Sequence, residues 1–535
     1  MSQPDRNPLR REFNVTVRVA ELGRDEAERV RPHIDGGDAQ RERERFPTVG
    51  GLAWQGWRRM LHPPTYPNRW RRAPPRSAST AAPRPEASWY ITIKMPEVRM
   101  SSITSAPTAF RRFRLARHAG VLLVCLAVPA PSAGQSETIA FTGASVIDPG
   151  TSGVLSNATV VVRDGVIVSV EEGGGAPAAA RAIDLGGRFL VPGLIDAHVH
   201  IGTLEAARRA LRSGVTTARS MGAGFFADVG LRELFRRGGL EGPEILAAGY
   251  HVRPRPAEGL FLDEPGLGDL LGRDVRGPEA MGRVARAMLD RGVDFVKVNA
   301  TERAGLPETD PRKPFFTEAE LSALVAEAEG GGVPVAAHAH GDRGGRAAVA
   351  AGVRSIEHGT YLRDETLRLM RERGTYLVPT IAVVSDLTVP GGDYDDPVLQ
   401  VRGRHMLPRV RETAAAAHAL GVPVVAATDT GYGSESVLRM SHELIEFVGI
   451  GMSEIEAIRA ATTVAAELLG IGDRTGRVAP GFEADLLVLD RNPLDDIGQY
   501  QDVLFVMSDG TIALDRLDFR ADAVGSRRVP DADWQ

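Results

Sequence analysis

The chain has 535 residues, with 64 Lys or Arg, 69 Asp or Glu and one cysteine. The first 134 residues hold 23 of the basic and 12 of the acidic side chains, so the remainder carries a formal charge near −16. Such an acidic surface excludes nucleic acid and anionic membranes as expected partners, and a lone cysteine excludes an internal disulfide.

Residues 1–99 do not have the pattern of a folded domain. They hold four of the five tryptophans and dense clusters of Arg and Pro, with no sustained helical or strand periodicity. We expect this segment to be a misassigned extension, with translation starting at Met100 or Met95; the alternative is a disordered basic region.

Residues 100–134 have the order of a secretory signal peptide. Four arginines between residues 111 and 117 precede the apolar run 121–128, and small residues follow at 132–134. The run is too short to span a bilayer and no lipobox precedes Cys125, so no stable membrane anchor is expected. The pattern predicts an exported protein, periplasmic or secreted, that begins near Gln135.

Short strand patterns occur at both ends of the remaining chain. Residues 139–142, 158–162 and 166–170 have strand character, and Arg163-Asp164-Gly165 is typical of a tight hairpin turn. Residues 484–489 and 503–512 have matching patterns. We therefore expect residues 135–190 and 475–520 to form one β-sandwich domain, followed by a tail at 521–535.

Residues 191–474 alternate strand and helix patterns, which predicts an α/β fold. Helical patterns at 278–291, 317–329, 364–373 and 401–420 separate many of the strands, and residues 453–469 follow as one amphipathic helix with Ser453 as its N-cap. Eight strand units predict a (β/α)8 TIM barrel. The strands are expected at residues 190–197, 215–220, 244–249, 294–300, 333–338, 355–358, 375–381 and 422–429.

Candidate metal ligands stand at the ends of four of these strands. His198 and His200 close strand one, His338 strand five, His358 strand six and Asp429 strand eight. Because catalytic groups of such barrels gather at the C-terminal ends of the strands, these side chains are expected to meet. A single histidine at such a position is more often structural, but this number at the strand ends of one barrel favours a metal site.

Lys297 is unusual in both residue type and position. The chain has three lysines against 61 arginines, and Lys297 lies within the apolar segment 293–300. A buried lysine, unlike an arginine, can lose its proton and act as a nucleophile. The alternative is a lysine whose ammonium group extends to a carboxylate at the strand end.

These motifs together resemble the amidohydrolase superfamily. The resemblance covers roughly residues 139–514 and is closest to the imidazolonepropionase-like branch, which includes prolidase-type Xaa-Pro and Xaa-Arg dipeptidases. In one stretch, residues 215–220, the family normally has an acidic residue where Ser220 stands. The motifs that carry the resemblance are residues 192–200, 295–298, 337–341, 355–360 and 476–486.

The resemblance implies a binuclear metal-dependent hydrolase that acts on carbon–nitrogen bonds. It implies two divalent ions, most simply Zn²⁺, and a carbon dioxide-derived carbamate on Lys297 between them. A hydroxide bridging the ions would attack the substrate carbonyl, and Asp429 would be the catalytic base. The implied ligands are His198, His200 and Asp429 for one ion, His338 and His358 for the other, and Lys297 for both.

Four further residues are candidates for substrate binding. His340 shares a face with His338 and is expected at the rim of the site, and His251 follows strand three. Arg253 and Arg255 are candidates to grip a substrate carboxylate. Loops at 251–277, 301–316 and 382–400 are expected to cover the site.

The expected substrate is a small amide or peptide, such as a dipeptide or an N-acyl amino acid. Ring opening of a cyclic amide, as in imidazolonepropionase or dihydroorotase relatives, is one alternative. A non-catalytic barrel scaffold is another, although the complete set of candidate ligands argues against it. The sequence leaves the oligomeric state open, a homo-oligomer included.

Overall fold

The computed structural model describes residues 138–151 and 153–518. The predicted extension at 1–99, signal peptide at 100–134 and tail at 521–535 lie outside the described residues. The described chain is a mixed α/β protein. None of the helices in this part is long and apolar enough to cross a membrane.

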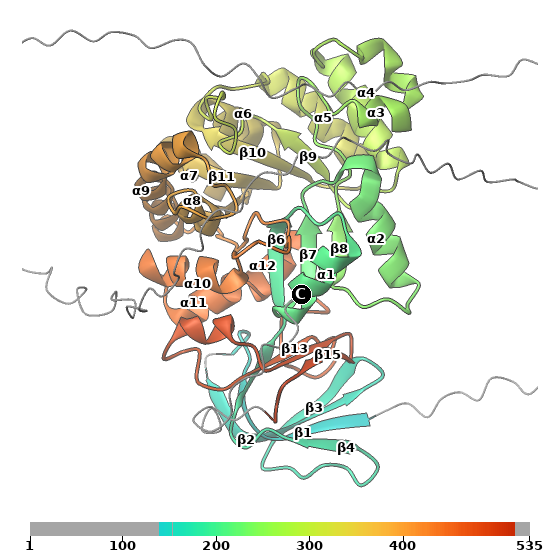
Figure 1. Ribbon diagram of the computed structural model, residues 1–535, viewed down its shortest axis with the longest axis vertical. Helices are drawn as coiled ribbons and strands as arrows, with labels where there is room; N and C mark the ends of the chain where they lie inside the picture. Colours follow the sequence, from blue (N-terminus) through green and yellow to red (C-terminus); the bar gives the residue numbers. More distant parts are fainter. Residues whose placement is uncertain (1–137, 152, 519–535) are drawn as a thin grey trace, which may run out of the picture. The chain divides into compact units, whose positions relative to one another are not determined.

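Strands from both ends of the described chain form one eight-stranded sheet, with the order β15-β14-β13-β5-β1-β2-β3 and β4 paired with β1. In Figure 1 the cyan and blue-green strands β1–β4 lie together with the red strands β13 and β15. Asp164 and Gly165 have φ angles of 51° and 78° in the predicted hairpin turn. The strands of this sheet are β1 (Thr138–Ile147), β2 (Val154–Arg163), β3 (Val166–Glu172), β4 (Arg181–Asp184), β5 (Phe189–Pro192), β13 (Leu486–Leu489), β14 (Phe505–Ser508) and β15 (Thr511–Asp515).

The single strand predicted at 190–197 is wrong, because the chain changes sheets at Gly193. Before it, β5 pairs antiparallel with β13, and after it β6 (Leu194–Val199) pairs parallel with β7 (Val215–Ser220). A Cβ added at Gly193 would lie 2.2 Å from Thr216 Oγ1. The glycine therefore allows the close approach that the change of sheet requires.

Parallel strands form two further sheets. One has the order β6-β7-β8 and the other β12-β11-β10-β9. Single parallel bridges join Val252 to Val298, Leu377 to Val424 and Val199 to Thr430, so the two sheets and residues 424–430 are connected in a ring. No continuous strand forms at the predicted eighth position, residues 422–429. This segment is paired with the neighbouring strands only by the single bridges at Val424 and Thr430. The remaining strands are β8 (Glu244–Ala247), β9 (Val296–Asn299), β10 (Val335–Gly341), β11 (Ser355–Tyr361) and β12 (Tyr376–Val378).

Helices follow most of the parallel strands, and four of them match the predicted ranges closely. They are α4 (Pro278–Asp290), α5 (Glu318–Gly330), α7 (Asp364–Arg373) and α9 (Pro397–Ala419). Thr317 and Glu320 form a capping box that starts α5. The other helices are α1 (Leu204–Arg212), α2 (Ala227–Arg236), α3 (Gly259–Asp263), α6 (Asp342–Ala351), α8 (Ile381–Asp386), α10 (Met440–Gly449), α11 (Glu454–Ala460) and α12 (Thr463–Leu469), with short 3-10 turns η2 (Gly224–Phe226), η3 (Pro265–Leu270) and η4 (Ile497–Gln501).

The single helix predicted at 453–469 is wrong. It begins at Ser453 and ends before Gly470 as expected, but it breaks into α11 and α12 at Thr462, whose φ and ψ are −137° and −93°. The Thr462 hydroxyl donates a hydrogen bond to the Ile458 carbonyl at 2.6 Å. A hydroxyl bonded to a backbone carbonyl competes with the backbone hydrogen bonds of a helix. The period of apolar residues carries no information on such a bond, so it did not predict this break.

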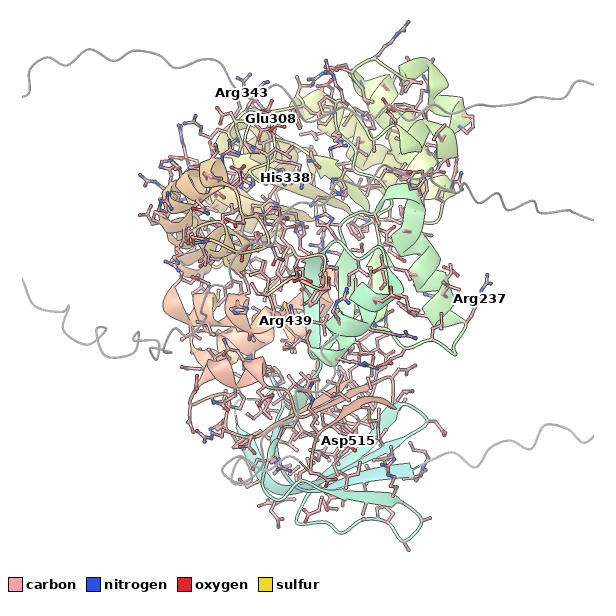
Figure 2. The ribbon with its side chains drawn as sticks, viewed as in Figure 1. Arg237, Glu308, His338, Arg343, Arg439 and Asp515 are labelled. Atoms are coloured by element: carbon pink, nitrogen blue, oxygen red, sulfur yellow. The ribbon has the colours of Figure 1, made fainter. Side chains whose placement is uncertain are left out.

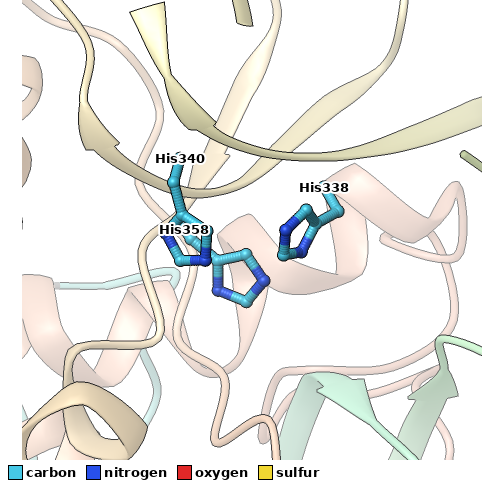
Figure 3. Close-up of side chains that lie close together, drawn as sticks. All are labelled: His338, His340 and His358. Carbon is cyan, nitrogen blue, oxygen red and sulfur yellow. The ribbon is translucent and has the colours of Figure 1, made fainter. Parts of the chain in front are cut away.

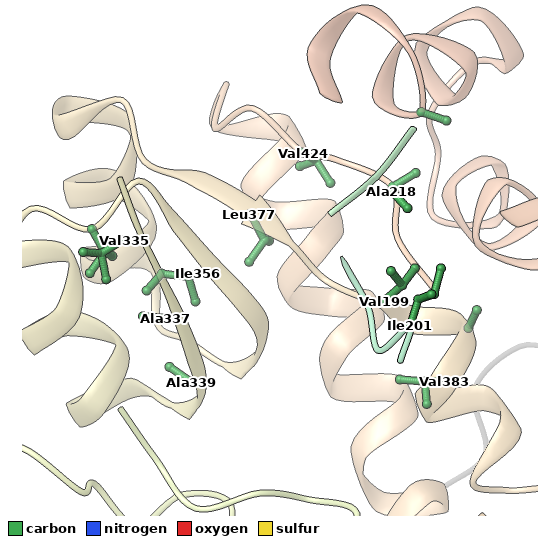
Figure 4. Close-up of a cluster of buried hydrophobic side chains, with 14 of the residues drawn as sticks. Val199, Ile201, Ala218, Val335, Ala337, Ala339, Ile356, Leu377, Val383 and Val424 are labelled. Carbon is green, nitrogen blue, oxygen red and sulfur yellow. The ribbon is translucent and has the colours of Figure 1, made fainter. Parts of the chain in front are cut away.

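An apolar core fills the space around the parallel strands. Figure 4 shows part of it, with Val335 and Ile356 from neighbouring strands and Leu377 beside Val424. Most buried side chains of these strands are Val, Ile, Leu or Ala, so the few charged side chains inside them are unusual.

Candidate metal centre

The candidate ligands from separate strands meet at one cavity, as the sequence predicts. Two groups of three have ligand atoms that all lie within 4.8 Å of one another inside each group. Figure 2 shows His338 among the ribbons of the parallel strands, whereas Arg237 projects outward. The two groups are His198, His200 and Asp429, and His338, His340 and His358.

The first group is organised around the Asp429 carboxylate. His198 Nε2 lies 3.3 Å and His200 Nε2 3.2 Å from Asp429 Oδ1. The opposite ring nitrogens are held elsewhere, His198 Nδ1 by Glu357 Oε2 at 2.9 Å and His200 Nδ1 by the Gly222 carbonyl at 3.1 Å. This is how proteins orient metal-binding imidazoles, with one nitrogen anchored and the other turned to the ion.

The second group consists of three buried histidines whose ring centroids lie 4.5 to 4.8 Å apart (Figure 3). Burial lowers the pKa of His340 to about 3 and holds those of His338 and His358 well below the ordinary value, so all three rings are neutral with a lone pair available. One nitrogen of each is anchored by an oxygen: His338 Nε2 by the Glu302 carbonyl at 3.2 Å, His340 Nδ1 by Thr360 Oγ1 at 2.9 Å and His358 Nδ1 by Thr380 Oγ1 at 2.7 Å.

Asp429 is ionised in this setting. Burial by itself would raise its pKa, but the electrostatic interaction with His198 and the hydrogen bonds from His198 and His200 outweigh burial and hold the pKa well below the ordinary value. The carboxylate therefore offers lone pairs for a metal ion or a proton.

Lys297 lines the same cavity and is 2% exposed. Its Nζ has no hydrogen-bond partner among the described residues, so the alternative of an ammonium bound to a strand-end carboxylate does not describe this chain. Burial lowers its pKa to about 8, against the opposing effect of the Glu357 and Asp429 charges. A buried amine without a partner, beside two groups of anchored imidazoles and an ionised carboxylate, fits a metal centre that it completes.

A buried ion pair behind His198 supports the first group, and the sequence analysis missed it. Glu357 accepts hydrogen bonds from Arg219 at 3.0 and 3.3 Å and from Ser355 at 2.5 Å, in addition to its contact with His198. Arg219 also donates to the Ala197 carbonyl at 2.6 Å, on the strand that carries His198. The signal in the sequence was a charged residue inside each of two buried strands.

The family follows from comparison with known proteins. A model of the amidohydrolase family matches residues 189–513, more than half of the chain. The chain belongs to the amidohydrolase family.

Three relatives locate this amidohydrolase within the family. Ochratoxinase from Aspergillus niger is 28% identical over 405 residues, covering 67% of this chain and 82% of its own length. Imidazolonepropionase from Acidiphilium cryptum is 29% identical over 384 residues, covering 64% and 90%. A crystal structure of a Xaa-Pro dipeptidase with methionine in its active site has a TM-score of 0.62 and 27% identity, covering 70% of this chain and 99% of that one. The predicted superfamily and branch are confirmed.

Asp196, from the first motif of this amidohydrolase, joins β6 to the segment that carries Asp429. Its carboxylate accepts hydrogen bonds from the Thr428 hydroxyl at 2.6 Å, the Thr428 amide at 3.0 Å and the Tyr432 hydroxyl at 2.9 Å. The Asp429 amide in turn donates to the His198 carbonyl at 2.8 Å. These bonds fix the spacing within the first group.

Three residues of the centre or its supports have a left-handed backbone. The φ angles are 71° at His358, 48° at Thr380 and 55° at Asp429. Such conformations cost non-glycine residues on the order of 1–3 kcal/mol and persist only where surrounding contacts enforce them. The side chains of His358 and Asp429 line the cavity, and the Thr380 hydroxyl holds His358 Nδ1 at 2.7 Å.

The four substrate-binding candidates have different outcomes. His251 lines the cavity with its ring centroid 5.5 Å from that of His200, and Arg253 lines an adjoining cavity. His340 is 3% exposed and part of the second group, so its predicted place at the rim is wrong. Arg255 has an 87% exposed side chain that pairs with Asp274 at 2.9 Å, so the structure does not bring it to the site.

Ser220, where the family normally has an acidic residue, is the last residue of β7. It is buried, and its hydroxyl has no hydrogen-bond partner among the described residues. The structure gives no role for it.

Proposed function

We propose that the chain is a binuclear metal-dependent amidohydrolase that cleaves the C–N bond of a dipeptide or an N-acyl amino acid. One observation carries the proposal: two groups of anchored candidate ligands converge on a cavity that also holds the unpartnered amine of Lys297. A chain retained only as a scaffold has no need of such an arrangement.

We assign His198, His200 and Asp429 to one ion and His338 and His358 to the other, with Lys297 as a carbamate between them. His340 lies in the second group and is available to it as a further ligand. Zinc suits imidazole and carboxylate donors. A carbamate forms on a neutral amine, and the lowered pKa of Lys297 increases that fraction near neutral pH.

Bound ions would lower the pKa of a water molecule and polarise the substrate carbonyl. The protein residues supply the proton transfers. Asp429 is ionised and lies beside both His198 and His200, so it is placed to accept a proton from the attacking water and deliver it to the leaving amine.

We also propose that the ring of parallel segments is the predicted (β/α)8 barrel and that the eight-stranded sheet is the predicted β-sandwich. The single bridges at Val252, Val424 and Thr430 would be the seams of the barrel. The similarity to the Xaa-Pro dipeptidase structure supports this interpretation.

A cyclic amide is the second candidate substrate, because an imidazolonepropionase is among the relatives. Both candidates use the same metal chemistry and differ in what leaves the site. A dipeptide yields two products, whereas a ring-opened amide yields one.

The test is turnover by the purified, zinc-loaded protein on a panel of dipeptides, N-acyl amino acids, lactams and esters. We expect release of free amino acids from members of the first two classes. Turnover of lactams alone would favour the cyclic alternative. No turnover of any class by protein carrying two ions per chain would refute the proposal.

A further inference from the structure

Two arginines face the candidate metal centre without a partner. Arg303 follows β9 and lines both the main cavity and the adjoining one, and Arg253 follows β8 and lines the adjoining cavity beside His200 and His251. Among the described residues neither guanidinium has a hydrogen bond or an ion pair. In the part of the chain that the structure describes, Asp429 is the one acidic residue that lines either cavity, so this region has an excess of positive charge.

Three other cations of these loops are paired with carboxylates. Arg255 binds Asp274 at 2.9 Å, Arg312 binds Asp310 at 3.0 Å and Lys313 binds Glu302 at 2.7 Å. These three exposed cations are compensated by a carboxylate, whereas Arg253 and Arg303, which face the cavities, are not. Burial and then the positive charge of Arg303 lower the pKa of Arg253, because the two like charges repel each other.

The loop that carries Arg303 is fixed by hydrogen bonds. Arg402 of α9 donates to the carbonyls of Ala304, Leu306 and Thr309, each at 2.6 Å, and the Thr309 hydroxyl donates to the Arg303 carbonyl. The backbone of Arg303 is therefore positioned before any ligand binds, which lowers the ordering cost of binding.

Three apolar side chains also line the main cavity. Val383 and Val384 of α8, with Leu387 directly after it, line the main cavity, and none of them lines the adjoining cavity that contains Arg253. The main cavity therefore offers the Arg303 guanidinium together with apolar side chains, whereas the adjoining cavity offers both guanidinium groups without these three apolar side chains.

We propose that Arg253 and Arg303 bind a free carboxylate on the leaving half of the substrate, while an apolar acyl half lies against Val383, Val384 and Leu387. Guanidinium groups match carboxylates in charge and geometry. The substrate class is then an amide between an apolar acyl group and an amino acid with a free α-carboxylate. This inference rests on the proposed function.

The binding experiment uses zinc-loaded protein with N-acetyl-L-leucine and N-acetyl-L-leucinamide, which differ only in the carboxylate. We expect the acid to bind at least about 10-fold more tightly than the amide, and Arg303→Gln and Arg253→Gln each to weaken acid binding about 10- to 100-fold without affecting the amide. Arg255→Gln is the matched control and should change neither. Melting curves of each variant check that it folds.

The kinetic experiment compares L-leucyl-L-proline with L-leucyl-L-prolinamide. The two arginine variants should raise KM for the acid and leave kcat within a few-fold, and Arg303→Lys should recover part of the loss because it retains the charge. The inference would be overturned if the wild type bound the acid and the amide with equal affinity. It would also be overturned if the arginine variants lost the same factor in affinity for both. Cleavage of L-leucyl-L-proline and L-leucyl-L-prolinamide with the same kcat/KM would also overturn the inference, but it would leave the proposed function intact. Selective carboxylate binding without turnover of any amide would remove the proposed function alone.

Discussion

Replacing Glu357 by glutamine removes the negative charge from the buried pair behind His198 and retains its shape. Burial alone would raise the pKa of Glu357, but the charge of Arg219 and the hydrogen bond from His198 lower it from 4.5 to about 2. For a fully buried carboxylate, this lowering of the pKa stabilises the folded state by about 3 kcal/mol above pH 4.5. The stabilisation is lost as the pH falls from 4.5 toward 2. Arg219 would also remain buried without its counter-charge.

The expected result for Glu357→Gln is a loss of about 3 kcal/mol in the free energy of unfolding, measured by urea titration of the metal-free protein at pH 7.5. Metal affinity should fall about 10- to 100-fold, measured by competition with a chromogenic chelator, because His198 loses its anionic anchor. Glu446→Gln is the matched control, since Glu446 forms a pair at 2.7 Å with a half-exposed Arg411 and its loss should cost at most about 1 kcal/mol. Equal destabilisation by the two variants, with metal affinity unchanged, would refute the reasoning.

Three further predictions concern single side chains. Asp429→Asn should retain most bound metal but lose nearly all turnover, because an amide cannot accept the proton; a near-normal rate would exclude Asp429 as the base, and complete loss of metal would make it chiefly a ligand. Lys297→Ala should lower bound metal from about two ions per chain toward one, with partial rescue of metal content and activity by acetate but none for Lys297→Arg; elemental analysis showing two ions in the alanine variant would contradict the bridging role. Burial raises the pKa of Asp228 from 3.8 to about 6, so ionisation of its carboxyl group destabilises the folded protein as the pH rises. The stability of Asp228→Asn relative to the wild type should therefore increase by about 3 kcal/mol between pH 4 and 7, and a pH-independent difference in urea titrations would count against this.

Local sequence pattern was sufficient for much of the fold. The period of apolar residues located most of the strands and four of the helices, and turn and cap residues such as Asp164-Gly165 and Thr317 located several of their ends. These signals are available in sequence because each depends on neighbours within a few residues. The candidate ligands were visible for the same reason, since chemically unusual residues at the ends of apolar runs stand out without any knowledge of contacts.

The tertiary structure alone decided which side chains support those ligands. Arg219 and Glu357 are 138 residues apart in sequence, and Asp196 and Tyr432 are 236 apart, so no local pattern relates them. The same applies to the burial of His340 beside His358, to the change of sheet at Gly193 and to the left-handed backbone at Asp429. The sequence specifies which groups are available, but the closure of distant strands determines which of them lose water and therefore which interact strongly.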